Sequence, residues 1–218
     1  MEWKVSNYPV AYKDALQEME RRVERVKQGD LDELIWLLEH PPLYTAGTSA
    51  KPQDLLQGAK GAFPVYETGR GGQYTYHGPG QRIAYMVLNL NRRTPDLRAY
   101  VKTLEQLIID TLSSFKINGF TRDRRIGVWV DTPQGEAKIA ALGVRVQQWV
   151  TSHGIAINVA PDLSNYSGIV PCGISNYGVT SLKELGIDVS MDEVDEAIKA
   201  AFEANFENGA FARQLATA

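Results

Sequence analysis

The chain has 218 residues, of which 44% are hydrophobic and 22% charged, with a formal net charge of −3 at pH 7. This composition is typical of a globular protein, and it excludes a basic nucleic-acid-binding protein because no block of Lys and Arg is present. Cys172 is the only cysteine, which excludes an internal disulfide. The apolar runs are too short to span a bilayer, and the N-terminus has no signal-peptide pattern. We therefore expect one domain over residues 1–218 in a reducing cytoplasm.

The first half of the chain predicts a helix followed by short strands. Apolar residues recur at three- and four-residue steps over residues 12–27, and Gly29 ends the predicted helix. Short apolar runs predict strands at residues 34–38, 63–67 and 83–90. Residues 45–61 carry Gly, Ser, Pro and Asp, which indicates a loop with one turn of helix. His40 precedes two prolines that end an element, so we expect it to have a structural role.

The next part predicts a long helix and an antiparallel sheet. Residues 96–116 have one apolar stripe, which we expect to lie in the core; it comprises Leu97, Val101, Leu104, Ile108, Leu112 and Phe115. From residue 126 onward three strands are predicted, joined by turns at residues 131–136 and 151–154. His153 falls in the second of these turns, and we expect it to be structural.

The C-terminal part contains two capping boxes, Ser181 with Glu184 and Ser190 with Glu193. The helix opened by the second box has apolar residues four positions apart: Val194, Ile198, Phe202 and Phe206. The tail, residues 209–218, is expected to fray. Together these elements predict an α+β fold, with a mixed, largely antiparallel sheet flanked by helices.

A glycine-rich stretch runs from Gly69 to Gln81, in which Arg, Gln, Thr, Tyr and His alternate with the glycines. Glycine allows a ligand to approach the backbone closely, whereas a simple linker has no aromatic residues. The stretch lacks the Walker and dinucleotide-binding patterns, so ATP and NAD signatures are missing here. From spacing alone it is either a hairpin loop or a backbone cradle with polar side chains.

Two further residues are candidates for chemistry. Cys172 lies between Pro171 and Gly173, which disfavours a helix or a central strand and places the thiol on a loop. Taken alone, it is either a nucleophile or a small buried apolar residue. Lys138 lies in a locally apolar stretch, which suggests that it is shielded from water. The alternative is a lysine that guards a strand edge.

Four motifs in this sequence resemble those of the lipoyl(octanoyl) transferases of the biotin/lipoyl protein ligase superfamily. They are Arg70-Gly71-Gly72-Gln73-x-Thr75-Tyr76-His77-Gly78-Pro79-Gly80-Gln81, Lys138-Ile139-Ala140-Ala141-Leu142-Gly143-Val144-Arg145, Ser152-His153-Gly154 and Pro171-Cys172-Gly173-Ile174. The resemblance covers residues 40–185. It implies the biotin/lipoyl ligase-type catalytic domain, and neither it nor the scattered histidines suggest a metal or a cofactor.

The resemblance also implies a set of site residues. Cys172 and Lys138 would be the catalytic pair, with the lysine activating the thiol and handling the proton of the incoming amine. The residues implied to line the acyl site are Arg70, Gly71, Gly72, Gln73, Tyr74, Thr75, Tyr76, His77, Ala141, Leu142, Gly143, Gly154, Ile155 and Ala156. His77 is the candidate for a polar contact near the thioester, and Tyr74, at the variable motif position, is a candidate for limiting the pocket. Backbone N–H groups of Gly71-Gly72 or Cys172-Gly173 are candidate oxyanion donors.

The implied reaction moves an octanoyl group from octanoyl-acyl carrier protein to Cys172 and then to a lysine of a lipoyl domain. The acceptors would be the E2 subunits of 2-oxoacid dehydrogenases and the glycine cleavage H protein, and the enzyme would act as a monomer, away from nucleic acids and membranes. Three alternatives remain at this point: an ATP-dependent lipoate–protein ligase, a relay amidotransferase that moves acyl groups between lipoyl-bearing proteins, and a non-catalytic binding module. Retention of both Cys172 and Lys138 argues against the last.

Overall fold

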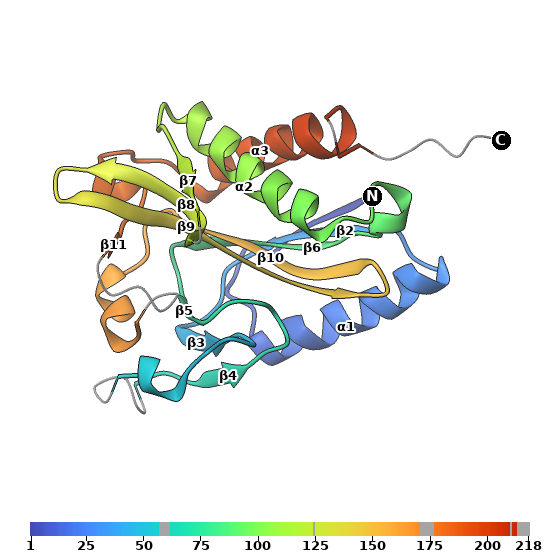
Figure 1. Ribbon diagram of the computed structural model, residues 1–218, viewed down its shortest axis with the longest axis horizontal. Coiled ribbons are helices and arrows are strands. Elements are labelled where there is room, and N and C mark those ends of the chain that lie inside the picture. Colours follow the sequence, from blue (N-terminus) through green and yellow to red (C-terminus); the bar gives the residue numbers. More distant parts are fainter. Residues whose placement is uncertain (57–61, 124, 171–176, 210, 213–218) are drawn as a thin grey trace.

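The computed structural model describes residues 1–56, 62–123, 125–170, 177–209 and 211–212 (Figure 1). Within these residues the chain forms a mixed eight-stranded sheet, a separate three-stranded sheet and helices on both faces of the larger sheet. The predicted α+β class is confirmed. No helix among the described residues is long and apolar enough to cross a bilayer.

The larger sheet has the strand order β1-β2-β6-β10-β9-β8-β7, with β11 paired to β9. Its strands are β1 (Glu2–Val5), β2 (Leu34–Leu38), β6 (Gln81–Val87), β7 (Phe120–Arg122), β8 (Arg125–Thr132), β9 (Gly135–Gln147), β10 (Val150–Asn158) and β11 (Gly178–Val179). The β1–β2 and β11–β9 pairs are parallel, and the other pairs are antiparallel. The prediction of an antiparallel arrangement for the strands after residue 126 is therefore confirmed.

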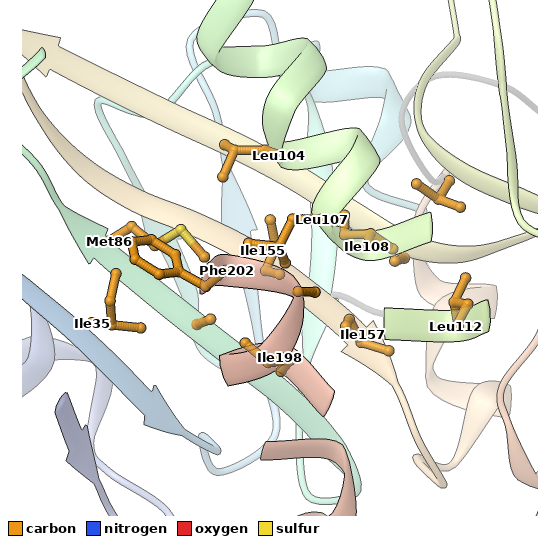
Figure 2. Close-up of a cluster of buried hydrophobic side chains, with 14 of the residues drawn as sticks. Ile35, Met86, Leu104, Leu107, Ile108, Leu112, Ile155, Ile157, Ile198 and Phe202 are labelled. Atoms are coloured by element: carbon orange, nitrogen blue, oxygen red, sulfur yellow. The ribbon is translucent and has the colours of Figure 1, made fainter. Parts of the chain in front are cut away.

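One face of this sheet is covered by α2 (Leu97–Ser114) and α3 (Met191–Phe202). Figure 2 shows how their apolar side chains meet those of the strands: Leu104, Leu107, Ile108 and Leu112 from α2, Ile198 and Phe202 from α3, and Ile35, Met86, Ile155 and Ile157 from the sheet. Burying each such side chain contributes about 1.5–3 kcal/mol. Both helices begin at sequence-readable caps: Asp96 accepts from the N–H groups of Arg98 and Ala99, and Ser190 forms the predicted capping box with Glu193.

The other face packs against α1 (Tyr12–Gln28), which lies across the sheet from α2 and α3 in Figure 1. Its buried stripe meets the opposite side chains of the same strands, which are Leu34, Trp36, Leu38, Ile83, Tyr85 and Val87. The helix ends as predicted at Gly29, whose φ of 81° is the left-handed conformation that glycine adopts without strain.

The smaller sheet pairs β3 (Leu43–Ala46) with β4 (Val65–Glu67) and β5 (Tyr74–His77), and it lies on the α1 side of the molecule (Figure 1). The predicted turn of helix is the 3₁₀ turn Pro52–Asp54. The predicted loop began too early, because Thr45 and Ala46 belong to β3.

One predicted turn is wrong. The chain reverses at Gln148 and Trp149, both with positive φ, and residues 151–154 lie inside β10. A two-residue turn of this kind normally carries Asn-Gly or another glycine pair, so Gln-Trp gives no signal in the sequence. His153 is consequently a strand residue, although its φ of 60° is unusual for a strand.

Candidate active site

A cavity of about 400 Å³ lies between the main sheet and the glycine-rich stretch. Its walls come from the stretch and β5 (Arg70, Gly71, Gly72, Gln73, Tyr74, Thr75, His77), from β9 (Ala141, Leu142, Gly143, Val144), from β10 (His153, Gly154, Ile155, Ala156), from β6 (Ile83, Tyr85), from α2 and β8 (Leu97, Val101, Ile126), and from Tyr12 and Ser49. The structure thus brings together three of the four sequence motifs around one space.

Small residues of β9 and β10 leave the room for this cavity. Ala141 pairs with Ala156 and Gly143 with Gly154, and all four line the wall. A Cβ at Gly154 would lie 2.1 Å from the carbonyl oxygen of Ala84, so the strands themselves require glycine there. Across the cavity, the Gly71 N–H donates to the carbonyl of Val144 at 3.0 Å, which ties the glycine-rich stretch to β9.

Arg70 organises the glycine-rich stretch from within. Its side chain is buried, and its guanidinium donates to the carbonyl and hydroxyl oxygens of Thr45 and to the carbonyls of Gly71 and Gln73. These bonds fold the stretch back onto β3. The predicted cradle therefore has a defined shape before any ligand binds.

His77 has a fixed tautomer. The amide nitrogen of Gln81 donates to Oδ1 of Asn158 and to the hydroxyl of Tyr166, so the amide oxygen of Gln81 faces the ring. Nδ1 of His77, 2.6 Å from that oxygen, must carry the proton. Burial lowers the pKa of His77 to about 3. The His77 ring is therefore neutral, and its Nε2 can accept a hydrogen bond.

The chain's three histidines, predicted to be scattered, lie close together, and two of them, His77 and His153, line the cavity. The ring of His40 lies 6.0 Å from that of His77 and 5.7 Å from that of Tyr85, which in turn lies 5.8 Å from His153. Burial lowers the pKa of both His40 and His153 to about 4. His40 is held on both nitrogens, by the carbonyl of Val10 at 2.6 Å and the hydroxyl of Tyr85 at 2.8 Å, which supports its structural assignment. Among the described residues, no cluster of three metal-ligating side chains is found.

The rim of the cavity is apolar and exposed. Leu97 is 44% exposed and Ile126 is 56% exposed, and Val101 lies with them in the wall. Leu97 and Val101 were predicted to be core residues. Both residues line the cavity, so this part of the apolar stripe of α2 faces the cavity instead. Periodicity alone does not distinguish the two environments.

Lys138 lies near this rim and is 6% exposed, as its apolar neighbours in the sequence suggested. Its Nζ donates to the carbonyl of Ile126 at 2.8 Å and lies 4.9 Å from the centre of the Trp129 ring. The pairing of β8 and β9 shifts register here, between Val128 and Trp129. A register shift of this kind marks a β-bulge, which redirects side chains. The cavity-lining part of β9 begins next to it.

Two other predicted site residues do not have their predicted roles, and two lie outside the described residues. Tyr76 is not among the described residues that line the cavity, and its ring packs against Tyr44 and Tyr166. The N–H of Gly71 is already bonded to Val144, so it does not serve as an oxyanion donor in this conformation. Cys172 and Gly173 lie outside the described residues. Tyr12, Tyr85 and Ile126 were not predicted as site residues, because they fall outside the motifs.

Comparisons with known proteins agree with one another. A family model described as the lipoyl protein ligase A/B catalytic domain matches residues 11–203. An octanoyltransferase of Paramagnetospirillum magneticum is 59% identical over 203 residues, covering 93% of this chain and 95% of the relative. An octanoyltransferase of Rhodopseudomonas palustris is 58% identical, covering 94% of this chain and 88% of the relative.

Solved structures show the same fold at low sequence identity. A bipartite lipoate protein ligase of Thermoplasma acidophilum superposes with a TM-score of 0.68 at 18% identity, covering 93% of this chain and 83% of its own. A lipoate-protein ligase A solved with bound ATP gives a TM-score of 0.71 at 15% identity, covering 93% and 85%. The predicted ligase-type fold is confirmed.

Proposed function

The chain belongs to the lipoyl protein ligase A/B catalytic-domain family, and from this premise we propose that it transfers octanoyl groups to lipoyl domains through a thioester on Cys172. It is an acyltransferase, as its relatives at 55–59% identity are. The observation that carries the octanoyl proposal is the cavity of about 400 Å³ between the motifs, with an apolar rim and small residues along β9 and β10. This space suits a linear acyl chain.

Lys138 is the proposed proton acceptor. Its buried side chain reaches the carbonyl of Ile126, a rim residue, so its amine lies beside the cavity entrance. The chain that follows Cys172 returns to the same place: Gly178 pairs with Ala137 and Val179 with Lys138.

The proposed reaction has two transfers. The Cys172 thiolate attacks the thioester carbonyl of octanoyl-acyl carrier protein, and the bond to the carrier sulfur breaks, which releases the carrier as a thiolate that takes a proton from water. The lysine amine of the lipoyl domain then attacks the new thioester, forms an amide and displaces the Cys172 sulfur. Lys138, as a neutral amine, accepts the proton that the attacking nitrogen loses. No step consumes ATP.

The proposed partners follow from this chemistry. The donor is an acyl carrier protein, and the acceptors are lipoyl domains of 2-oxoacid dehydrogenase E2 subunits and the glycine cleavage H protein. We place the reaction in the cytoplasm, catalysed by a monomer. The oxyanion donors are proposed to come from Gly72 or from the Cys172-Gly173 backbone, since the Gly71 N–H is already used.

Intact-mass measurement tests the proposal. The full chain is mixed with octanoyl-acyl carrier protein, without ATP, and an adduct of one octanoyl group is expected on the wild type and not on Cys172→Ser. Adding an apo lipoyl domain should discharge the adduct and acylate the domain. An octanoyl adduct on Cys172→Ser, or transfer that occurs only with free octanoate and ATP, would overturn the thioester mechanism.

A further inference from the structure

The register shift between β8 and β9 places a tryptophan opposite Lys138, and the proposed reaction assigns no role to it. Val128 pairs with Ala140, and without the shift the next pair would join Trp129 to Ile139. The shift leaves Ile139 as the extra residue, so Trp129 pairs with Lys138 instead. Directly opposite residues of an antiparallel pair project from the same face of the sheet, which brings the indole ring and the lysine side chain together.

The two side chains form a buried cation–π contact. Nζ of Lys138 lies 4.9 Å from the centre of the Trp129 ring, and the two residues are 6% and 2% exposed. The face of an indole ring attracts an ammonium group, and this attraction is stronger where water is excluded. The bond from Nζ to the carbonyl of Ile126 fixes one direction of the amine. Because lysine has a flexible four-carbon stem, contact with the ring further limits where the amine can lie.

The Trp129 ring is itself held by two neighbours. Its Nε1 donates to the carbonyl of Arg125 at 3.2 Å, and the Arg125 guanidinium lies 4.8 Å from the ring centre. The Tyr177 ring packs edge-on against Trp129 at 5.4 Å between centroids, and its centre lies 4.2 Å from the same guanidinium. Arg125 also donates to Glu136 of β9 at 2.6 Å. Residues of β8 and β9 and the residue that precedes β11 therefore meet around this ring.

Trp36 provides a matched comparison within the same chain. It is 3% exposed, its Nε1 donates to the hydroxyl of Ser6 at 3.0 Å, and Nζ of Lys4 lies 3.9 Å from its ring centre. Neither Trp36 nor Lys4 is among the described residues that line the cavity. A buried tryptophan with a lysine amine over its ring is thus present both at the proposed site and away from it.

We propose that Trp129 is a positioning residue for Lys138: its ring holds the amine beside the cavity rim, and Arg125 and Tyr177 hold the ring. This inference rests on the proposed function, because it concerns how that site keeps its proton acceptor in place. A displacement of about 1 Å can greatly reduce the effect of a catalytic group. The loss then falls on the rate of the chemical step and not on substrate binding.

Steady-state transfer tests the proposal in Trp129→Leu and Trp129→Phe, with Trp36→Leu and Trp36→Phe as the matched controls. In Trp129→Leu, kcat should fall by about two- to thirtyfold, the usual strength of a cation–π contact expressed as a ratio of rates, and KM for the lipoyl domain should not change. Trp129→Phe keeps an aromatic face and should recover most of the lost rate. Both Trp36 variants should transfer at the wild-type rate. An unchanged kcat in Trp129→Leu, or an equal loss in Trp36→Leu, would overturn the inference.

The Lys138→Met background separates positioning from a general structural effect. If Trp129 acts through the amine, Trp129→Leu should not lower the residual rate of Lys138→Met, whereas an independent effect would lower it by the same factor as in the wild type. Arg125→Met releases the ring without a change in the core, and Glu136 keeps its bond to Arg122. This variant should lower kcat in the wild type and not in Lys138→Met, and it decides the question if Trp129→Leu does not fold.

An NMR measurement separates this inference from the proposed reaction, because it needs neither donor nor acceptor. The ε-methylene signal of Lys138, identified by its loss in Lys138→Met, should be shifted upfield by the Trp129 ring. In Trp129→Leu and Arg125→Met it should move toward the signal of Lys199, a surface lysine. If transfer fails in the wild type but the signal behaves in this way, the positioning holds and the reaction is wrong. A signal that neither variant changes would show that the ring does not hold the amine.

Discussion

Nζ of Lys138 lies 2.8 Å from the carbonyl oxygen of Ile126, a residue of the neighbouring strand that also forms part of the cavity rim. The side chain reaches this carbonyl by passing over Gly127, where a Cβ would lie 3.2 Å from Cε of Lys138. The position of the proposed catalytic amine therefore depends on β8 as much as on the strand that carries it.

Lys138→Met keeps a long, flexible side chain and removes the amine. We expect acyl transfer to fall by about 10²–10⁴-fold, which is the usual contribution of a positioned proton acceptor. The free energy of unfolding should change little, because an apolar side chain of similar length fills the same buried space and the residue whose carbonyl loses its donor, Ile126, is exposed. Steady-state transfer and urea unfolding measure the two quantities. Lys199→Met, at a surface lysine paired with Glu196, is the matched control; full-rate transfer by Lys138→Met would contradict the assignment.

Gly127→Ala and Gly135→Ala form a pair matched in backbone conformation. Gly127 has φ of +118° and Gly135 has φ of +113°, so alanine is strained at both, by about 1–3 kcal/mol. A Cβ at Gly135 meets nothing within 4 Å, whereas one at Gly127 would lie 2.7 Å from the carbonyl oxygen of Ala140. Both variants should unfold at lower urea concentration, Gly127→Ala more so, and only Gly127→Ala should lose transfer activity. Equal activity of the two would show that β8 does not position Lys138.

The fold was largely predictable from the sequence because periodicity and capping agree with the tertiary structure. The helix that Gly29 ends and the capping box at Ser190 are local signals that the structure retains. The reversal at Gln148 and Trp149 was missed, because both residues adopt positive φ without a glycine. Tertiary pairing of β9 with β10 imposes that turn, and no local pattern reports it.

The residues of the site could be predicted where they lie in a sequence motif, and not elsewhere. The glycine-rich stretch indicated a cradle, but the sequence did not show that the Arg70 guanidinium is used to fold the cradle itself. Tyr12 reads as the first residue of an amphipathic helix, and Leu97 as part of a core stripe. Only the tertiary packing that brings these parts of α1 and α2 to the cavity separates the two residues from ordinary core positions.

Acid should destabilise the fold through the buried histidines. The pKa of His40 falls to about 4 on folding because of burial, from an ordinary value near 6.5. Between these pH values the unfolded chain binds more protons than the folded chain. The contribution of His40 to the free energy of unfolding is therefore complete above pH 6.5 and decreases as the pH falls toward 4. For His40 alone, the loss between pH 7 and pH 5 is about 2 kcal/mol.

Urea unfolding of the wild type and His40→Asn at pH 7 and pH 5 isolates this contribution. His40→Asn is expected to be less stable at pH 7, because the bonds to Val10 and Tyr85 are lost or weakened. Its stability should nevertheless fall less between the two pH values than that of the wild type. Equal losses in the two proteins would mean that His40 is not held neutral in the folded state.

Arg93 and Glu33 form an ion pair whose side chains are both fully buried, with N–O distances of 2.7 and 3.1 Å. Arg93→Met leaves a buried carboxylate without its cation and should lower the free energy of unfolding by about 3–5 kcal/mol. Arg93→Met combined with Glu33→Leu should cost less than the sum of the single changes, because neither charge is then left alone. Urea unfolding of all four proteins completes the cycle, and additive losses would contradict the coupling.

Tyr12→Phe and Tyr85→Phe should have different effects on stability, although both remove one buried hydroxyl from the same cavity wall. The Tyr12 hydroxyl has no partner among the described residues, so its removal should leave the free energy of unfolding unchanged or raise it slightly. The Tyr85 hydroxyl donates to His40, and its loss leaves a buried ring nitrogen unpaired, at a cost of about 1–3 kcal/mol. Thermal and urea unfolding without ligand measure both. A loss in Tyr12→Phe as large as that in Tyr85→Phe would show that the Tyr12 hydroxyl is bonded in the free protein.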